Sequence, residues 1–293
     1  MTIVTHNGIF HADEVTAIAL LQVFGIADGI KIIRTRDTNV IKEADMAIDV
    51  GGEFDGESRF DHHQVAYTGE LSSAGMVWEH IGLTSQYHSI SNLVEEVDAQ
   101  DTGTKRQEAN HYCNIVSSFN TDDIYGSEQD AAFNDAVAFA ARYLLALKKQ
   151  EETKRMLQQI ADCTTVKTVG QNKGDPDFDM LDDDEYWHIT GEYRYAGIRI
   201  AKIPKGVRFV PTEYFVGRCD LVVQWDEGQG CWSVQTVPLK RGEFGAKLKL
   251  LNSKNAVFVH KAGFIGKYPD GGEICVTVQD GGLCPTICIN MQE

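Results

Sequence analysis

The chain has 293 residues, 43% of them hydrophobic, and a formal net charge of −16. This length and composition support a substantial core in one or two domains, and the negative charge argues against a general nucleic-acid coat protein. No apolar run approaches the roughly 20 residues of a membrane span, and because the first residues contain neither a basic segment nor a cleavable apolar one, we expect no secretory signal. Because the seven cysteines are dispersed, we expect a reducing, cytoplasmic environment.

Strands and helices alternate through the first 100 residues. The hydrophobic patterns predict strands at Thr2–Thr5, Ile30–Arg34 and Ala44–Val50, and helices at Glu14–Phe24, at Ser72–Ile81 and from Ser91 onward. Such alternation predicts a parallel sheet. Ligands bind at the carboxyl ends of the strands in these sheets, and His6 and Asp49 fall there.

The remainder of the chain predicts a second domain. Ser127–Asp162 has the pattern of a long connecting helix, and the acidic run Asp175–Glu185 predicts a solvated loop. Beyond Trp187 the sequence predicts strands, such as Leu221–Trp225 and Trp232–Val237. The expected fold class is therefore α/β, with domains at 1–164 and 165–293.

Charge is distributed unevenly along the chain. From Trp187 to Tyr268 there are 13 Lys and Arg residues against 6 Asp and Glu, whereas the rest has 14 against 37. The basic segment either meets an anion or carries its Lys and Arg on ordinary solvated strands, and the sequence leaves both open.

Imidazole and carboxylate side chains gather in clusters, each at the end of a short apolar run. The candidate metal ligands are His6, His11, Asp13, Asp49, His62, Asp98 and Asp101, with Asp61 and His63 beside them. A mixture of His and Asp favours manganese or zinc, whereas an all-oxygen site would favour magnesium or calcium. A pair of such metals is a common means of hydrolysing phosphate esters.

Several of these residues have separable expected roles. Asp49 could bridge two metals, because a carboxylate has two oxygens, and Asp61 could orient an imidazole. One histidine of the His62-His63 pair can bind metal while the other faces the substrate. Asp98 and Asp101 share a helix face; one is expected to ligate metal and the other to cap a helix or hold water.

The motif series resembles that of the DHH phosphoesterases. The sequences of these motifs are most similar to those of the melanocyte-proliferating-gene family within that superfamily. The matching phrases are Thr5-His6-Asn7-Gly8, His11-Ala12-Asp13-Glu14, Asp49-Val50-Gly51-Gly52, Phe60-Asp61-His62-His63-Gln64, Leu71-Ser72-Ser73-Ala74-Gly75, Val97-Asp98-Ala99 and the segment from Phe258 to Gly266. The resemblance therefore covers nearly the whole chain.

The resemblance implies a division of the metal ligands. By position, His6, His11 and Asp49 would hold one metal, and Asp13, Asp49, His62 and either Asp98 or Asp101 would hold the second. His63 would face the phosphate. Many superfamily members have Asp in place of His11, so their metal preference does not transfer directly to this chain. After Gly266 the sequence differs from the usual family motif, so substrate preference does not transfer directly either.

The C-terminal phrase has two readings. His260, Lys261, Gly263 and Gly266 either form an ordinary hairpin or bind the non-scissile part of an anionic substrate. We expect the second, with the C-terminal domain, a smaller mixed α/β domain, closing over the active-site cleft.

The expected function is metal-dependent phosphoester hydrolysis with two divalent ions, preferably Mn²⁺, as cofactors. The family resemblance implies an exonuclease that acts on short single-stranded RNA or DNA. The first alternative is a small-substrate phosphatase or pyrophosphatase, which suits the acidic charge. The second is a non-catalytic metal-binding protein. No membrane contact is expected, and a homo-oligomer stays open.

Overall fold

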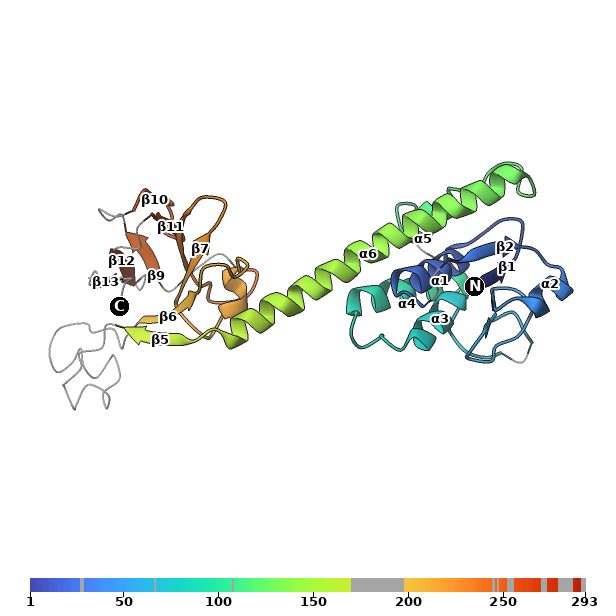
Figure 1. Ribbon diagram of the computed structural model, residues 1–293, viewed down its shortest axis with the longest axis horizontal. Helices are drawn as coiled ribbons and strands as arrows, with labels where there is room; N and C mark the ends of the chain where they lie inside the picture. Colours follow the sequence, from blue (N-terminus) through green and yellow to red (C-terminus); the bar gives the residue numbers. More distant parts are fainter. Residues whose placement is uncertain are drawn as a thin grey trace. The chain divides into compact units, whose positions relative to one another are not determined.

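The protein is described here by a computed structural model (Figure 1). The residues it describes are 1–26, 29–65, 67–106, 108–169, 198–243, 246, 248–251, 256–269, 273–278 and 287–290. The chain divides into two compact units, Met1–Thr153 and Lys154–Glu293. Within the described ranges, no helix combines the length and the apolar character needed to cross a membrane. The predicted acidic loop Asp175–Glu185 lies outside these ranges.

The first unit is built on a four-stranded parallel sheet. Its strands, in spatial order, are β2 (Lys31–Arg34), β1 (Thr2–Thr5), β3 (Met46–Ile48) and β4 (Arg59–Phe60). The predicted α/β class with a parallel sheet is thereby confirmed.

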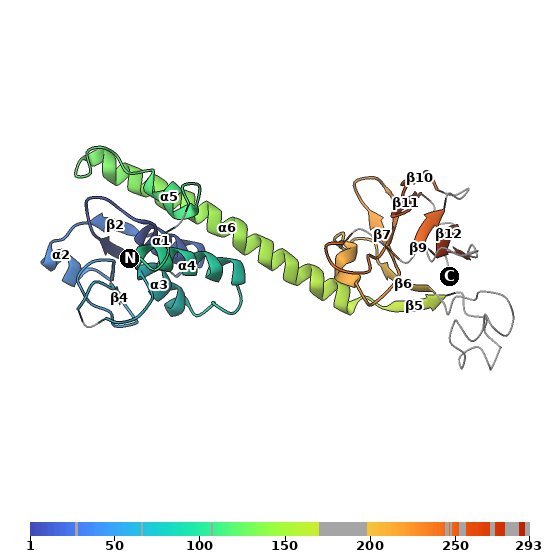
Figure 2. The ribbon, with the colours of Figure 1, turned by 180° about the vertical axis from the view of Figure 1, so that it is seen from behind.

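Helices cover both faces of this sheet, because alternate residues of each strand point to opposite sides. One core contains Ile3, Met46 and Ile48. The helices that share this core are α1 (Ala12–Val23), α3 (Ser73–Ile81), α4 (His88–Asp101), α5 (Tyr112–Ser117) and the first part of α6 (Ser127–Cys163). A separate cluster joins Val4 and Ala47 to α2 (Thr38–Glu43). Figure 2 shows α1, α3 and α4 gathered together, with α2 apart from them.

The strand order creates a crevice between β1 and β3. The chain passes from β1 to β2 on one side of β1 and returns to β3 on its other side. Two neighbouring strands whose connections diverge in this way leave a crevice at their carboxyl ends, where α/β proteins bind ligands. His6 directly follows β1 and Asp49 directly follows β3, so the fold brings these two side chains to the same crevice.

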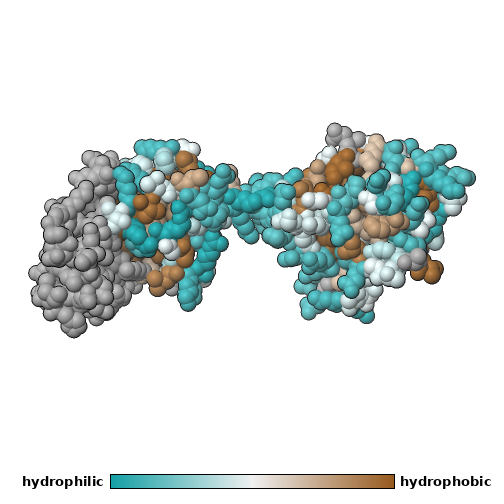
Figure 3. Space-filling model, turned by 90° about the horizontal axis from the view of Figure 1, so that it is seen from below, coloured by the Kyte–Doolittle hydropathy of each residue, from teal (hydrophilic) through white to brown (hydrophobic). Residues whose placement is uncertain are grey.

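Helix α6 belongs to the cores of both units. Phe133 and Leu144 are buried in the first unit, whereas Leu157 and Ala161 are buried with residues of the second. The stretch between these contacts is rich in Lys, Gln and Glu, and Figure 3 shows it as hydrophilic.

The described part of the second unit contains two sheets. A six-stranded mixed sheet has the order β10-β11-β8-β7-β6-β5, and a three-stranded antiparallel sheet has the order β13-β12-β9. The bounds are β5 (Val166–Val169), β6 (Ile198–Ile203), β7 (Leu221–Asp226), β8 (Cys231–Thr236), β9 (Leu248–Leu251), β10 (Phe258–Val259), β11 (Ile265–Tyr268), β12 (Glu273–Val278) and β13 (Ile287–Asn290), with a 3₁₀ turn, η2, at Thr212–Phe215.

Two helices were not expected from the sequence. Helices α2 and α5 have six residues each, too short for a clear periodic signal. They form because tertiary contacts bury Ile41 of α2 and Tyr112, Cys113 and Val116 of α5. Helix α4 also begins earlier than predicted, at His88 rather than Ser91.

Candidate metal centre

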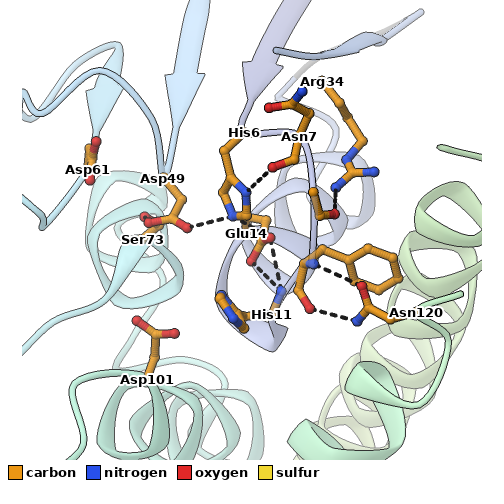
Figure 4. A network of polar contacts seen from close by, with 12 residues as sticks. His6, Asn7, His11, Glu14, Arg34, Asp49, Asp61, Ser73, Asp101 and Asn120 are labelled. Atoms are coloured by element: carbon orange, nitrogen blue, oxygen red, sulfur yellow. Dashed lines mark hydrogen bonds and ion pairs between the residues drawn. The ribbon is translucent and has the colours of Figure 1, made fainter. Parts of the chain in front are cut away.

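The loop from His6 to His11 carries the first two candidate ligands. Gly8 turns the chain with φ 94°, a conformation that favours glycine. The Gly8 carbonyl accepts hydrogen bonds from the Arg34 guanidinium at 2.7 Å and from the Gln129 amide at 3.0 Å. The Asn120 side chain bonds both the N–H and the C=O of Phe10. Residues far apart in the sequence therefore fix the loop that positions both histidines (Figure 4).

Glu14 was not among the predicted site residues, yet it joins the two histidines. Its side chain is fully buried. It accepts the His11 N–H at 3.0 Å and lies 3.0 Å from His6 Nε2. The sequence held a usable signal, because an acidic residue three positions after a helix N-cap commonly bonds back to the cap.

Asp49 lies at the centre of the cluster in a strained conformation. Its φ is 55°, the one positive value among the described non-glycine residues, and such strain concentrates at functional sites. Asp49 Oδ2 is 3.2 Å from His6 Nε2, and Oδ1 is 3.2 Å from His63 Nδ1. Burial opposes ionisation, but hydrogen bonds from the two histidines hold the pKa of Asp49 below its usual range.

The two histidines also carry raised pKa values. Burial alone would lower the pKa of His6, but hydrogen bonds to Asp49 and Glu14 raise it to about 10. Hydrogen bonds to Asp49 and Asp61 raise the pKa of His63 to about 9. Both imidazoles therefore hold their protons firmly unless another cation displaces them.

Asp61 anchors His63. Asp61 Oδ2 accepts the Gly52 N–H at 2.6 Å, and Oδ1 accepts the backbone N–H of His63 and lies 2.9 Å from its Nδ1. The His63 side chain is 62% exposed. Because Nδ1 is engaged by carboxylates, Nε2 is the nitrogen left to meet a substrate. The imidazole that Asp61 orients is thus that of His63.

Asp98 and Asp101 lie on one face of α4 but do different things. Asp98 Oδ1 accepts hydrogen bonds from Ser72 N, Ser72 Oγ and Gly75 N, which ties α4 to the first turn of α3. Burial raises the pKa of Asp98 to about 6, against those hydrogen bonds. Asp101 Oδ2 instead lies 3.1 Å from His62 Nε2. The structure thus brings Asp101, and not Asp98, to the candidate ligands.

Asp13 is the least satisfied group of the cluster. It is fully buried, and neither carboxylate oxygen has a hydrogen-bond partner among the described residues. Burial and the charges of Asp49, Glu14 and Asp101 raise its pKa well above the usual value. A buried carboxylate without a partner costs free energy, and a divalent cation would remove that cost. The buried His62 Nδ1 has no partner among the described residues either.

These donors form three overlapping groups that could each hold a metal ion. The groups are His6, His11, Glu14 and Asp49; Asp49, His62 and His63; and His11, Asp13 and Asp101, with ligand atoms within 4.8 Å of one another in each. Asp49 belongs to two groups and so does His11. Imidazole and carboxylate donors at this spacing fit divalent metals of the manganese or zinc kind.

A cavity of about 650 Å³ opens beside the cluster. It lies within the first unit, and its lining includes His6, His11, Asp49, Asp61 and His63. A smaller cavity of about 320 Å³ is lined by residues that include His11, His63 and Asp101. The candidate ligands are therefore accessible, as a substrate would require.

The C-terminal candidates lie on a hairpin of the second unit. His260 and Lys261 are exposed in the loop between β10 and β11, and His260 Nδ1 accepts the Ala262 N–H at 3.2 Å. Gly263 has φ 73°, and a Cβ there would come within 2.2 Å of Lys249 Cγ. Gly266 pairs with Val259 and Val234 in the sheet. The structure therefore contains the hairpin that was one of the two alternatives for this segment. Binding of an anionic substrate by these residues stays a proposal.

Residues 2–175 match the family described as MYG1_exonuc, uncharacterised protein family UPF0160. The chain belongs to this family. Among MYG1 relatives, the MYG1 protein of Chlamydia trachomatis is 41% identical over 155 residues, which cover 50% of this chain and 53% of that protein. The MYG1 exonuclease of Homo sapiens is 38% identical over 130 residues, or 34% of this chain and 35% of that protein.

The aligned part spans about half the length of the Chlamydia relatives. A solved structure of a pGpG-specific phosphodiesterase from Vibrio cholerae aligns over 82% of this chain and 83% of its own. Its identity is 14% and its TM-score 0.30, a similarity too low to carry a conclusion. The predicted resemblance to the melanocyte-proliferating-gene family is confirmed by the MYG1 matches.

Proposed function

We propose that this chain is a metal-dependent phosphoester hydrolase that acts as an exonuclease on short single-stranded RNA or DNA. The observation that carries the proposal is Asp13, a fully buried carboxylate without a partner among the described residues, inside a cluster of His and Asp donors. The name exonuclease on mammalian MYG1 relatives supports the choice of substrate. The open cavity beside the donors supports catalysis over simple metal storage.

The ligands divide between two proposed sites. His6, His11, Glu14 and Asp49 would hold one ion, and Asp13, Asp49, His62 and Asp101 the other, with Asp49 shared. Two such ions would supply an activated water and neutralise charge on the phosphate. Manganese is the preferred cofactor on the donor chemistry, with magnesium or zinc as alternatives.

Two residues of the first unit would act on the substrate itself. His63 is exposed, and Asp61 fixes its ring so that Nε2 can donate a hydrogen bond to a phosphate oxygen. Asp61 acts by holding that ring and its proton in place. In the second unit, His260, Lys261 and the backbone at Gly263 and Gly266 are proposed to contact phosphates away from the scissile bond.

A small-substrate phosphatase or pyrophosphatase is the second candidate. The first unit has 10 Lys and Arg residues against 25 Asp and Glu, a balance that repels a long polyanion. A pyrophosphate would avoid most of that repulsion, because its whole charge could lie at the metal ions.

The test is a substrate panel. The manganese-loaded protein is incubated with labelled oligoribonucleotides, oligodeoxynucleotides, a dinucleotide and pyrophosphate, and the products are resolved. Stepwise release of mononucleotides is expected, and the Asp13→Asn variant should release none. Exposed Asp135 on α6 provides the matched control, Asp135→Asn, which should cleave normally. Cleavage of pyrophosphate alone would replace the exonuclease proposal with the second candidate.

A further inference from the structure

The cavity beside the metal ligands is also lined by residues that are not candidate ligands. Among them are Ile9, Arg36, Ile124 and Tyr125. We propose that Arg36 and Tyr125 form a nucleotide subsite, in which Arg36 binds the phosphate next to the scissile one and Tyr125 stacks on a base. This inference rests on the proposed function, since it takes a nucleic-acid strand as the substrate.

The charge and surroundings of Arg36 support a role in binding an anion. It is exposed, it is the only Lys or Arg among the described residues that line this cavity, and no hydrogen bond or ion pair within the described chain engages its guanidinium. Although the first unit has 25 acidic residues, none of those that the structure describes forms an ion pair with Arg36. A guanidinium suits a phosphate because its donors match two phosphate oxygens.

Arg34, two residues earlier, shows what a structural arginine looks like in this fold. Its side chain is 3% exposed, it bonds the Gly8 carbonyl and Asp130, and its guanidinium lies 4.7 Å from the centre of the Phe133 ring. The bond to the Gly8 carbonyl holds the loop that carries His6 and His11, and the contacts with Asp130 and Phe133 tie Arg34 to α6. Arg36 makes none of them, so its side chain remains available to a ligand.

Tyr125 offers an aromatic face at the same cavity. It is 75% exposed, although an aromatic ring gains free energy from burial. Its Cε1 lies 3.5 Å from where a Cβ on Gly8 would be, so the ring rests against the loop that carries His6 and His11. Exposed Ile9 lines the same cavity. An exposed aromatic ring and a cation at one site are the combination with which proteins bind single strands without reading their sequence.

The two residues predict different substrate dependences. A dinucleotide has one phosphate, which would lie at the metal ions, whereas a trinucleotide has a second phosphate for Arg36, whichever end is attacked. The wild type should therefore have a lower KM for triadenylate than for diadenylate. Arg36→Ala should raise the KM for triadenylate by about tenfold and leave diadenylate unchanged. Tyr125→Ala should raise both by about tenfold, and Tyr125→Phe should not.

Arg142 on α6 is the matched control, because it is exposed in the same unit and does not line this cavity. Arg142→Ala should behave as wild type with both substrates. The subsite is overturned if Arg36→Ala and Arg142→Ala have the same KM for triadenylate, or if Tyr125→Ala binds both strands normally. Circular dichroism and manganese content should be those of the wild type in every variant.

Diadenylate and triadenylate also distinguish a failure of this subsite from a failure of the proposed exonuclease function. If the wild type hydrolyses neither strand, the exonuclease proposal fails, and calorimetric titration of diadenylate and triadenylate then tests the subsite without turnover. The affinity ratio between the two strands should be lost in Arg36→Ala. An unchanged ratio overturns the subsite as well.

Discussion

Replacing Asp13 by Asn should stabilise the metal-free protein and remove most of the stabilisation that manganese provides. Asp13 is fully buried, and its pKa is raised by burial and by the charges of Asp49, Glu14 and Asp101. Without metal, the wild-type carboxylate either stays charged among other carboxylates or takes up a proton. The Asn side chain has nearly the same shape, carries no charge and can donate its amide N–H to the neighbouring Glu14 carboxylate, so it removes that cost.

The size of the effect follows from the burial. An unsatisfied buried group costs about 1–3 kcal/mol, and a charged one more, so the metal-free variant should be more stable by about that amount. For a unit of 153 residues, each kcal/mol corresponds to roughly 2–4 °C in Tm. Wild type at a manganese concentration of 100 Kd gains about 2.7 kcal/mol, whereas a variant whose Kd rises roughly 100-fold gains only about 0.4 kcal/mol.

Thermal unfolding in EDTA and in manganese measures both effects. Asp13→Asn should unfold at a higher temperature than wild type in EDTA and show almost no increase with manganese, while Asp135→Asn should follow the wild type in both. A variant that is less stable than wild type in EDTA, or that still gains the full manganese shift, would refute the reasoning.

Three further predictions follow from the same contacts. His63→Ala should lose turnover with little change in manganese affinity, whereas His62→Ala should lose manganese. Calorimetric titration with manganese measures both affinities, and an equal loss in the two variants would contradict this prediction. Asp98→Ala should lower the free energy of unfolding by about 1–3 kcal/mol, because Ser72 and Gly75 lose their acceptor, yet its metal content should stay normal. Manganese affinity should rise from pH 6.5 to about 10, because manganese must displace the proton that Asp49 and Glu14 hold on His6. In the metal-free protein, the ion pairs of His6 stabilise the fold at the acid end of that pH window, and this stabilisation is lost as the pH approaches 10. Proton release measured in buffers of different ionisation enthalpy checks this, and a pH-independent affinity would contradict it.

The alternation of apolar runs was enough to predict the parallel sheet and to place the bounds of β1, β2 and β3 to within two residues. His6 and Asp49 could be located because each polar residue follows a buried strand, and the sheet brings such residues together. The long α6 was also clear, because its pattern runs through 37 residues without Pro or Gly. These features depend on local sequence, so a single chain reveals them.

What the sequence left open depends on tertiary contacts. Asp98 and Asp101 have equivalent positions in the helix pattern, and only the approach of α3 makes one a capping group and the other a partner of His62. Glu14 was overlooked because its neighbours His11 and Asp13 already accounted for the motif. Arg36 and Arg34 look alike in sequence, and their difference appears only when Asp130 and Gly8 are placed beside one of them.

The central claim is a two-metal site that shares Asp49. Titrating the protein with manganese, with the bound ion counted by elemental analysis and the coupling of neighbouring ions followed by electron paramagnetic resonance, tests it most directly. The account predicts two ions per chain with magnetic coupling between them, and loss of that coupling in Asp49→Asn. Saturation at a single uncoupled ion per chain would contradict it.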